Sequence, residues 1–237
     1  ITFEGLLVLT TGHPAAYRYA LFSVPILLTP AVWAVRSIQN DTSLQRQTPN
    51  HPAPFAPILM ILFSGSLQLT GENAVRTFFN VYLDARLHMP PALIGALWSA
   101  AQFLGIVAAL TTPYLTARWG KLRIAIAGAF GMVLCLFPFA LIPQWLPAGL
   151  ALAGLIFFAG IRRPAYTLYH QELVSQSWRG AMSGTTSLSA GISNAAIAFG
   201  GGYLISAFGY PTLFLTGAAL TTLGTLIFWT YFRTPRG

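Results

Sequence analysis

Long apolar runs separated by short breaks dominate the pattern of hydrophobic and polar positions along the chain. Crossing the hydrocarbon core of a bilayer takes about 20 residues of helix. Six runs of about that length or longer follow residue 54, at 55–83, 92–115, 122–142, 147–168, 181–207 and 211–232. Proline and glycine mark the breaks at 90–91, 143–147 and 209–211. The pattern therefore predicts six membrane-spanning helices in this part of the chain.

The pattern changes before residue 55. Residues 1–11 are apolar but too short to span, whereas 17–36 can form one helix kinked by two prolines, which membrane helices tolerate. The polar stretch 37–54 has three prolines and no periodic apolar face, as is typical of a linker. We therefore expect 1–36 to be the end of one helical group, followed by the linker 37–54 and a six-helix bundle at 55–237. A chain that starts inside a helix is also expected to be a fragment of a longer protein.

Composition supports a membrane location. Hydrophobic residues make up 55% of the chain and charged residues only 8%, whereas soluble domains carry about 25% charged residues. A water-facing surface cannot be built from so few charges at this length. The fold class predicted is an all-α, polytopic helical bundle. The run 181–207 is rich in Gly, Ser and Thr, which let helices approach closely in lipid, so it is expected to pack in the interior.

The net charge of +8 is explained by membrane topology, because cytoplasmic loops collect Lys and Arg. Ten of the 13 cations lie in alternate loops: Arg36, Arg46, Arg118, Lys121, Arg123, Arg162, Arg163, Arg179, Arg233 and Arg236. The intervening loops hold only Arg18 and Arg86, and Arg76 lies within a helix. The linker and the C-terminus are therefore predicted to be cytoplasmic, in a multi-pass protein of the cell membrane. The cations are scattered, so a nucleic-acid partner is not expected.

The loop 113–123 (PYLTARWGKLR) resembles the loop signature of the major facilitator superfamily (MFS) in its second-half copy, roughly Gly-x-Leu-Ala-Asp-Arg-x-Gly-Arg-Lys. Positions that keep the signature are Leu115, Arg118, Gly120 and, by charge, Lys121. Pro113 stands where the first glycine belongs, and Ala117 replaces the aspartate. The absence of that carboxylate argues against a charge-relay gate at this loop.

Three further segments resemble the same family in order and spacing. The segment 172–184 resembles the loop before helix 11, with Arg179 and Gly180 ahead of the helix. The segments 196–211 and 78–95 resemble the turn into helix 12 and the passage from helix 7 to helix 8. The resemblance implies that the chain holds the end of helix 5, helix 6, a central loop and helices 7 to 12. It also implies that two six-helix halves rock around a midplane site, so the missing N-terminal helices would be required partners.

Glu72 and Arg76 are the main candidates for a site. Their i, i+4 spacing places them on one face of a helix, and charges inside membrane helices usually face a cavity or a partner. The hypothesis is that Glu72 binds a coupling proton or a cationic substrate and that Arg76 tunes it. Glu72 would lie about 25 Å along its helix, in the outer half. The alternative is that the pair snorkels near the outer interface.

Other polar residues of the helices could line a substrate pathway or could bond to neighbouring helices instead. These candidates are Asn73, Asn80, Gln102, Ser189 and Ser193. Asn73 and Asn80 are seven residues apart and share a face. Ser189 and Ser193 form a stripe that is more typical of close packing. Arg162 and Arg163 are expected at the end of the fourth helix, as headgroup anchors or as an inner gate with Glu172.

Enzyme chemistry finds no support in the sequence. No His or Cys spacing suits a metal, no loop resembles a phosphate-binding loop, and no serine sits in a nucleophile elbow, so no cofactor is expected. The function predicted is secondary active transport of a small molecule, with a lean to proton-coupled efflux of small amphipathic compounds. The alternative is a membrane scaffold or sensor. A transporter requires an open polar cavity, whereas a scaffold would have its polar stripes satisfied by neighbouring helices.

Overall fold

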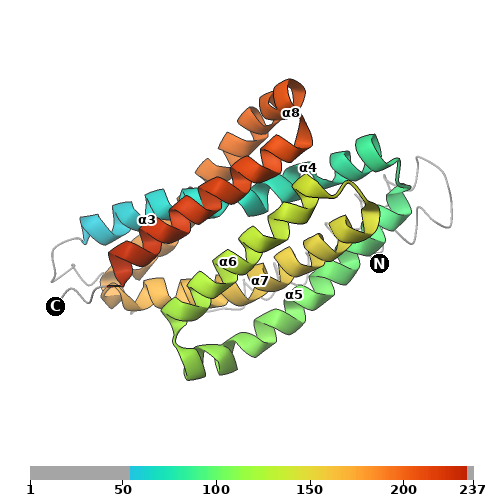
Figure 1. Ribbon diagram of the computed structural model, residues 1–237. Coiled ribbons are helices and arrows are strands. Elements are labelled where there is room, and N and C mark those ends of the chain that lie inside the picture. Colours follow the sequence, from blue (N-terminus) through green and yellow to red (C-terminus); the bar gives the residue numbers. More distant parts are fainter. Residues whose placement is uncertain (1–53, 234–237) are drawn as a thin grey trace, which may run out of the picture.

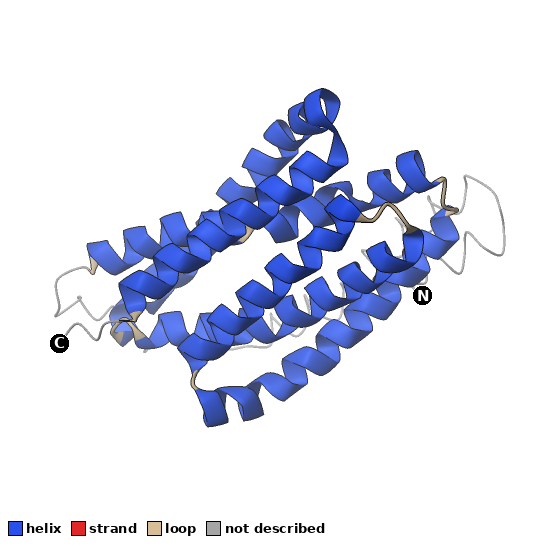
Figure 2. Cartoon of the chain, viewed as in Figure 1, coloured by secondary structure: helices blue, strands red, loops and turns tan. Residues whose placement is uncertain are grey.

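The structure, a computed structural model, describes residues 54–233. The expected helix at 17–36, the start of the chain before it and nearly all of the linker lie outside the described residues. Within 54–233 the chain is helical and contains no strand (Figure 2). The predicted all-α class is therefore confirmed.

The described helices follow one another with short connections (Figure 1). They are α3 (Phe55–Gln68), α4 (Thr70–Leu87), α5 (Pro91–Trp119), α6 (Lys121–Leu141), α7 (Trp145–Glu172), the 3-10 helix η1 (Gln176–Trp178) and α8 (Arg179–Phe232). Five continuous helical segments in this range are long and apolar enough to cross a membrane: Phe55–Leu87, Pro91–Trp119, Lys121–Leu141, Trp145–Glu172 and Gln176–Phe232.

Two local features relate these segments to the six predicted runs. At Leu69, between α3 and α4, the backbone stays in the right-handed helical region, and its N–H bonds the Gly65 carbonyl 3.1 Å away. The two helices therefore make one span. Inside α8, Gly209 has φ 84° and ψ 173°, which favours glycine, and Pro211 follows. The chain bends sharply there and α8 forms two arms (Figure 1), as the predicted break at 209–211 requires.

The structure extends two helices beyond their predicted ends. α5 continues through Pro113 to Trp119, and α7 continues through Pro164 to Glu172. Proline removes one backbone donor, but packed membrane helices tolerate this loss. The expectation that Arg162 and Arg163 end the fourth helix is therefore wrong, because α7 extends nine residues beyond Arg163.

α6 packs between α7 and the second arm of α8, α5 lies against α7, and α3 and α4 lie against α8. An aromatic cluster joins α4, α6 and α8 at one end of the bundle. Phe139 lies 5.7 Å from Phe79 and 5.1 Å from Phe214 between ring centroids, and Tyr82 lies 5.6 Å from Phe214. Aromatic rings prefer such separations, so this cluster fixes how the three helices sit together.

The first arm of α8, at 179–208, is more open than the sequence predicted. One face is buried against α3 and α4, through Met182, Ser189, Ser193 and Ile197. A methyl group added at Gly191 or Gly202 would meet no atom within 4 Å. The prediction that 181–207 packs in the interior is therefore wrong for this chain, in which a single face of the arm is buried.

Candidate functional site

Glu72 lies in the first turn of α4, and its side chain is 1% exposed. One of its oxygens, Oε1, accepts a hydrogen bond from Arg76 Nε at 2.8 Å, so the expected i, i+4 pair forms. The same oxygen accepts a second bond from Arg163 Nη2 of α7. Glu72 thus connects α4 to a helix that lies far away in the sequence.

The position of Glu72 along its segment disfavours a purely interfacial role. It lies 17 residues after Phe55 in a continuous span of 33 residues, which is about 25 Å along a length of about 50 Å. Glu72 is therefore near the middle of the span rather than at an end. A snorkelling carboxylate would be exposed to solvent, whereas this one is buried with two guanidinium groups.

Arg162 is also buried, at 2% exposure. Its Nη2 donates to Gln68 Oε1, and Gln68 Nε2 donates to the Gly224 carbonyl at 3.2 Å. Its guanidinium carbon lies 4.7 Å from the ring centroid of Tyr166, at a distance suited to a cation–π interaction. Arg162 therefore ties α7 to α3 and α8, and sequence reasoning did not anticipate this role.

Of the other predicted polar residues, four form hydrogen bonds with a neighbouring helix and one, Gln102, is exposed. Asn73 Nδ2 donates to Ser193 Oγ at 3.0 Å, and Ser189 Oγ donates to the Leu62 carbonyl at 3.1 Å. These bonds join helices, as the packing alternative expected. Asn80 accepts from Trp98 Nε1 at 2.7 Å, so it does not share a partner with Asn73. Gln102 differs because it is exposed on α5.

Gln102 faces an open pocket of about 310 Å³ between α4, α5 and α7. Its polar lining consists of Arg76, Gln102 and Arg163. The rest of the lining is small or apolar: Gly105, Ile106, Ala109, Ile156, Ala159, Gly160 and Pro164. The two arginines that hold Glu72 therefore also form one side of this pocket, which we call the arginine pocket.

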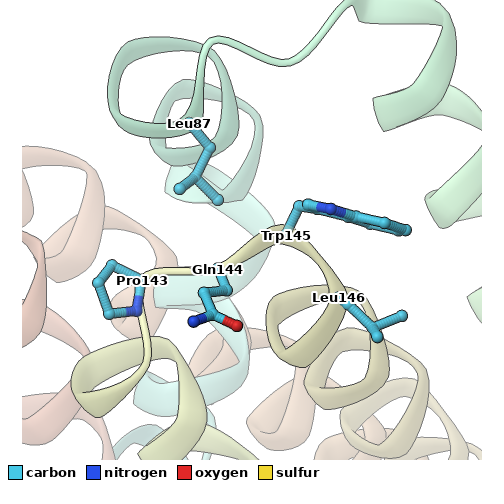
Figure 3. A pocket seen from close by; sticks show the side chains of 5 residues that line it. All are labelled: Leu87, Pro143, Gln144, Trp145 and Leu146. Carbon is cyan, nitrogen blue, oxygen red and sulfur yellow. The ribbon is translucent and has the colours of Figure 1, made fainter.

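A second hollow, of about 470 Å³, lies where α4 ends and the loop joins α6 to α7 (Figure 3). It is lined by Leu87, Pro143, Gln144, Trp145 and Leu146. None of these side chains carries a charge, and none belongs to the predicted site. Within 54–233, no group of three His, Cys, Asp or Glu side chains is placed to hold a metal ion.

The predicted loop motif lies at the opposite end of the bundle from this hollow. Gly120 separates α5 from α6 with φ 87°, and Lys121 forms an ion pair with Glu172 at the end of α7. Arg118 donates to Tyr114 Oη at 3.3 Å. Arg179 and Gly180 begin α8. Glu172 thus pairs with Lys121, and the inner gate expected between Glu172 and the two arginines of α7 is not formed.

We expect the Lys121–Glu172 pair to contribute little stability, because the side chains are 32% and 57% exposed. Replacement Lys121→Met should change the free energy of unfolding by less than about 1 kcal/mol. Denaturant unfolding of the purified chain in detergent would measure this, with Glu172→Gln as the matched partner variant. A loss of about 2 kcal/mol or more from either change would contradict the prediction.

Comparison with known proteins agrees with the helical architecture and the loop motif. A search of curated proteins finds no match to the chain. The family described as Major Facilitator Superfamily matches residues 3–198, which is more than half of the sequence. The match includes α3 to α7 and much of the first arm of α8. The chain therefore belongs to the major facilitator superfamily, a family of membrane-embedded transporters.

Proposed function

We propose that this chain forms the second half of a secondary active transporter that works by alternating access. The supporting observation is a buried ion cluster beside an open pocket: Glu72 is 1% exposed, and its partners Arg76 and Arg163 line the pocket. Charges inside a membrane protein are costly and usually mark a substrate or ion pathway. A scaffold or sensor would have no need for arginines that remain accessible from a cavity.

In this proposal Glu72 carries the coupling proton. Its charged oxygen joins α4 to α7 through Arg163. A proton on Glu72 would remove the negative charge that attracts both arginines. The link between the two helices would then weaken, as alternating access requires of a contact that is made in one state and broken in another.

The N-terminal helices of the same protein are the proposed partner of this half, with lipid around the rest. Large apolar side chains are exposed on α5 and on the first arm of α8, among them Phe103, Leu110, Phe199 and Tyr203. We place the linker and the C-terminus in the cytoplasm of a plasma or inner membrane. The basis is the cations of the α5–α6 connection and the start of α8, such as Arg118 and Arg179.

The proposed substrate is a small amphipathic molecule, moved outward without chemical change. The arginine pocket combines apolar walls with a few polar groups, as binding sites for small molecules generally do. Pockets for small molecules have volumes of roughly 300–1,000 Å³. The arginine pocket, at about 310 Å³, lies near the lower end of that range and suits a small compound.

The test is transport by the whole protein containing this chain, reconstituted in vesicles with a pH-sensitive dye inside. We expect Glu72→Gln to reduce proton movement driven by a panel of amphipathic compounds to below about a tenth of wild type, because the amide cannot carry the proton. The matched control is Asp84→Asn, on the same helix but exposed. It should retain wild-type flux.

Full proton-coupled flux in Glu72→Gln would refute the coupling role of Glu72. Absence of flux in the wild type for every compound, with the protein folded, would instead favour the scaffold or sensor alternative. An unchanged flux in both variants would show that neither carboxylate takes part.

A further inference from the structure

We propose that the arginine pocket binds an organic anion, a carboxylate on a small apolar body, through the guanidinium groups of Arg76 and Arg163 and the amide of Gln102. This inference rests on the proposed function, because it names the substrate class of that pathway. It replaces the cationic substrate that Glu72 alone would favour.

The charges around the pocket do not balance. Arg76 and Arg163 both bond one carboxylate, that of Glu72. The neighbouring Arg162 is buried, and its hydrogen-bond acceptor is the neutral amide of Gln68. Among the described residues the remaining acids are Asp84, which is exposed at the far end of α4, and Glu172, which pairs with Lys121. Cations in a membrane interior require compensation. The described part of the chain thus leaves an excess of two positive charges that a bound anion could reduce.

The two lining arginines remain accessible. Each has one bond to Glu72 Oε1, from Arg76 Nε and from Arg163 Nη2. Their side chains are 30% and 55% exposed. A guanidinium group offers five donors in a planar fork that suits a carboxylate. Both arginines therefore retain donors for a ligand while still paired with Glu72.

Glu72 acts as a positioning residue in this site. Both arginines donate to the same oxygen, so Glu72 holds two guanidinium groups from different helices on one side of the pocket. An incoming carboxylate would meet donors that are already oriented, which lowers the entropic cost of binding. A cation would instead meet two like charges and a carboxylate that already has two partners.

The other lining residues define the body of the ligand. Ile106, Ala109, Ile156 and Ala159 provide apolar walls. α5 and α7 approach closely at Gly105 and Gly160, where a methyl group on Gly105 would lie 2.8 Å from Ile156 Cγ2. This close approach fixes the floor of the pocket. A flat apolar ring or a short chain attached to the carboxylate fits such a lining.

The test uses benzoate, with benzamide and benzylamine as neutral and cationic analogues, and the full 237-residue chain in detergent. Calorimetric titration should show saturable benzoate binding and at least about tenfold weaker binding of both analogues, because only the carboxylate can form a bidentate pair of opposite charges with a guanidinium group. Arg163→Gln should weaken benzoate binding at least about tenfold. Ala109→Phe, which fills the pocket and leaves its charges in place, should have a similar effect.

The matched control is Arg123→Gln, which removes an exposed cation of α6 that does not line the pocket. It should leave benzoate affinity unchanged. Equal binding of benzoate and benzamide, an equal loss in Arg123→Gln, or full binding in Ala109→Phe would overturn the proposal. If Arg163→Gln does not fold, the analogue series and Ala109→Phe decide the matter.

An anionic lipid headgroup could reach the same arginines, so the titration is repeated in nanodiscs of phosphatidylcholine with and without phosphatidylglycerol. Unchanged benzoate binding supports a small-molecule site, whereas its loss with phosphatidylglycerol shows a lipid site and overturns the proposal. Binding is measured without transport. Failure here, with transport still dependent on Glu72, would leave the transporter proposal intact.

Discussion

Replacement Gly224→Val should destabilise the helical bundle by about 3 kcal/mol. A Cβ atom on Gly224 would lie 2.7 Å from Leu67 Cβ, 2.8 Å from the Gln68 nitrogen and 2.8 Å from the Ser64 carbonyl oxygen. The last two are backbone atoms that cannot rotate away, so α8 would have to move away from α3. That movement would also stretch the bond from Gln68 Nε2 to the Gly224 carbonyl.

The effect can be measured by denaturant unfolding of the chain in detergent, followed by circular dichroism. Gly202→Val is the matched control, because it makes the same change on the same helix where no atom lies within 4 Å. Since valine has a higher helix propensity than glycine, this control should be neutral or slightly stabilising. Equal destabilisation by the two changes would show that the α3–α8 contact is not responsible.

For residues 54–233 the sequence was sufficient to predict the order of the spans, because each span needs a minimum apolar length and the breaks contain Gly and Pro. Gly209 and Pro211 are the clearest case. A glycine with positive φ followed by a proline interrupts a helix through local backbone geometry, so the break does not depend on tertiary contacts. Pro164, which directly follows Arg163, suggests a helix end by the same rule. In a packed membrane helix its lost donor is tolerated, and α7 continues for eight more residues.

Only the contact within a single helix could be predicted for the candidate site. The Glu72–Arg76 pair follows from i, i+4 spacing, whereas Arg163 contacts Glu72 across 91 residues. If the predicted fourth helix had been extended to Glu172, the rise per residue would have placed Arg163 about 14 Å from the helix end. A double arginine at that depth is a signal for a buried site. The prediction for the first arm of α8 was wrong for a different reason. Small residues indicate close packing, but they do not show which helix packs there or how many faces are buried.

Replacement Gln68→Leu should cost about 3 kcal/mol of unfolding free energy. Gln68 is 1% exposed, and its Oε1 accepts the bond from Arg162 Nη2. Leucine has a similar size but accepts no hydrogen bond, so the buried guanidinium group would lose the Gln68 acceptor and keep its contact with the Tyr166 ring. An unpaired buried charge is among the largest single sources of destabilisation.

The double variant Gln68→Leu/Arg162→Met separates this cost from a simple packing defect. Two apolar side chains of similar volume can replace a buried polar pair with little loss, so the double variant should lie within about 1 kcal/mol of wild type. Arg162→Met alone should cost about 1 kcal/mol, because it leaves the buried Gln68 Oε1 without a donor. The coupling energy from the cycle should then be about 3 kcal/mol. Gln102→Leu, the same change at an exposed glutamine of α5, provides the control. A double variant as unstable as Gln68→Leu alone would mean that lost packing, and not the stranded charge of Arg162, destabilises the bundle.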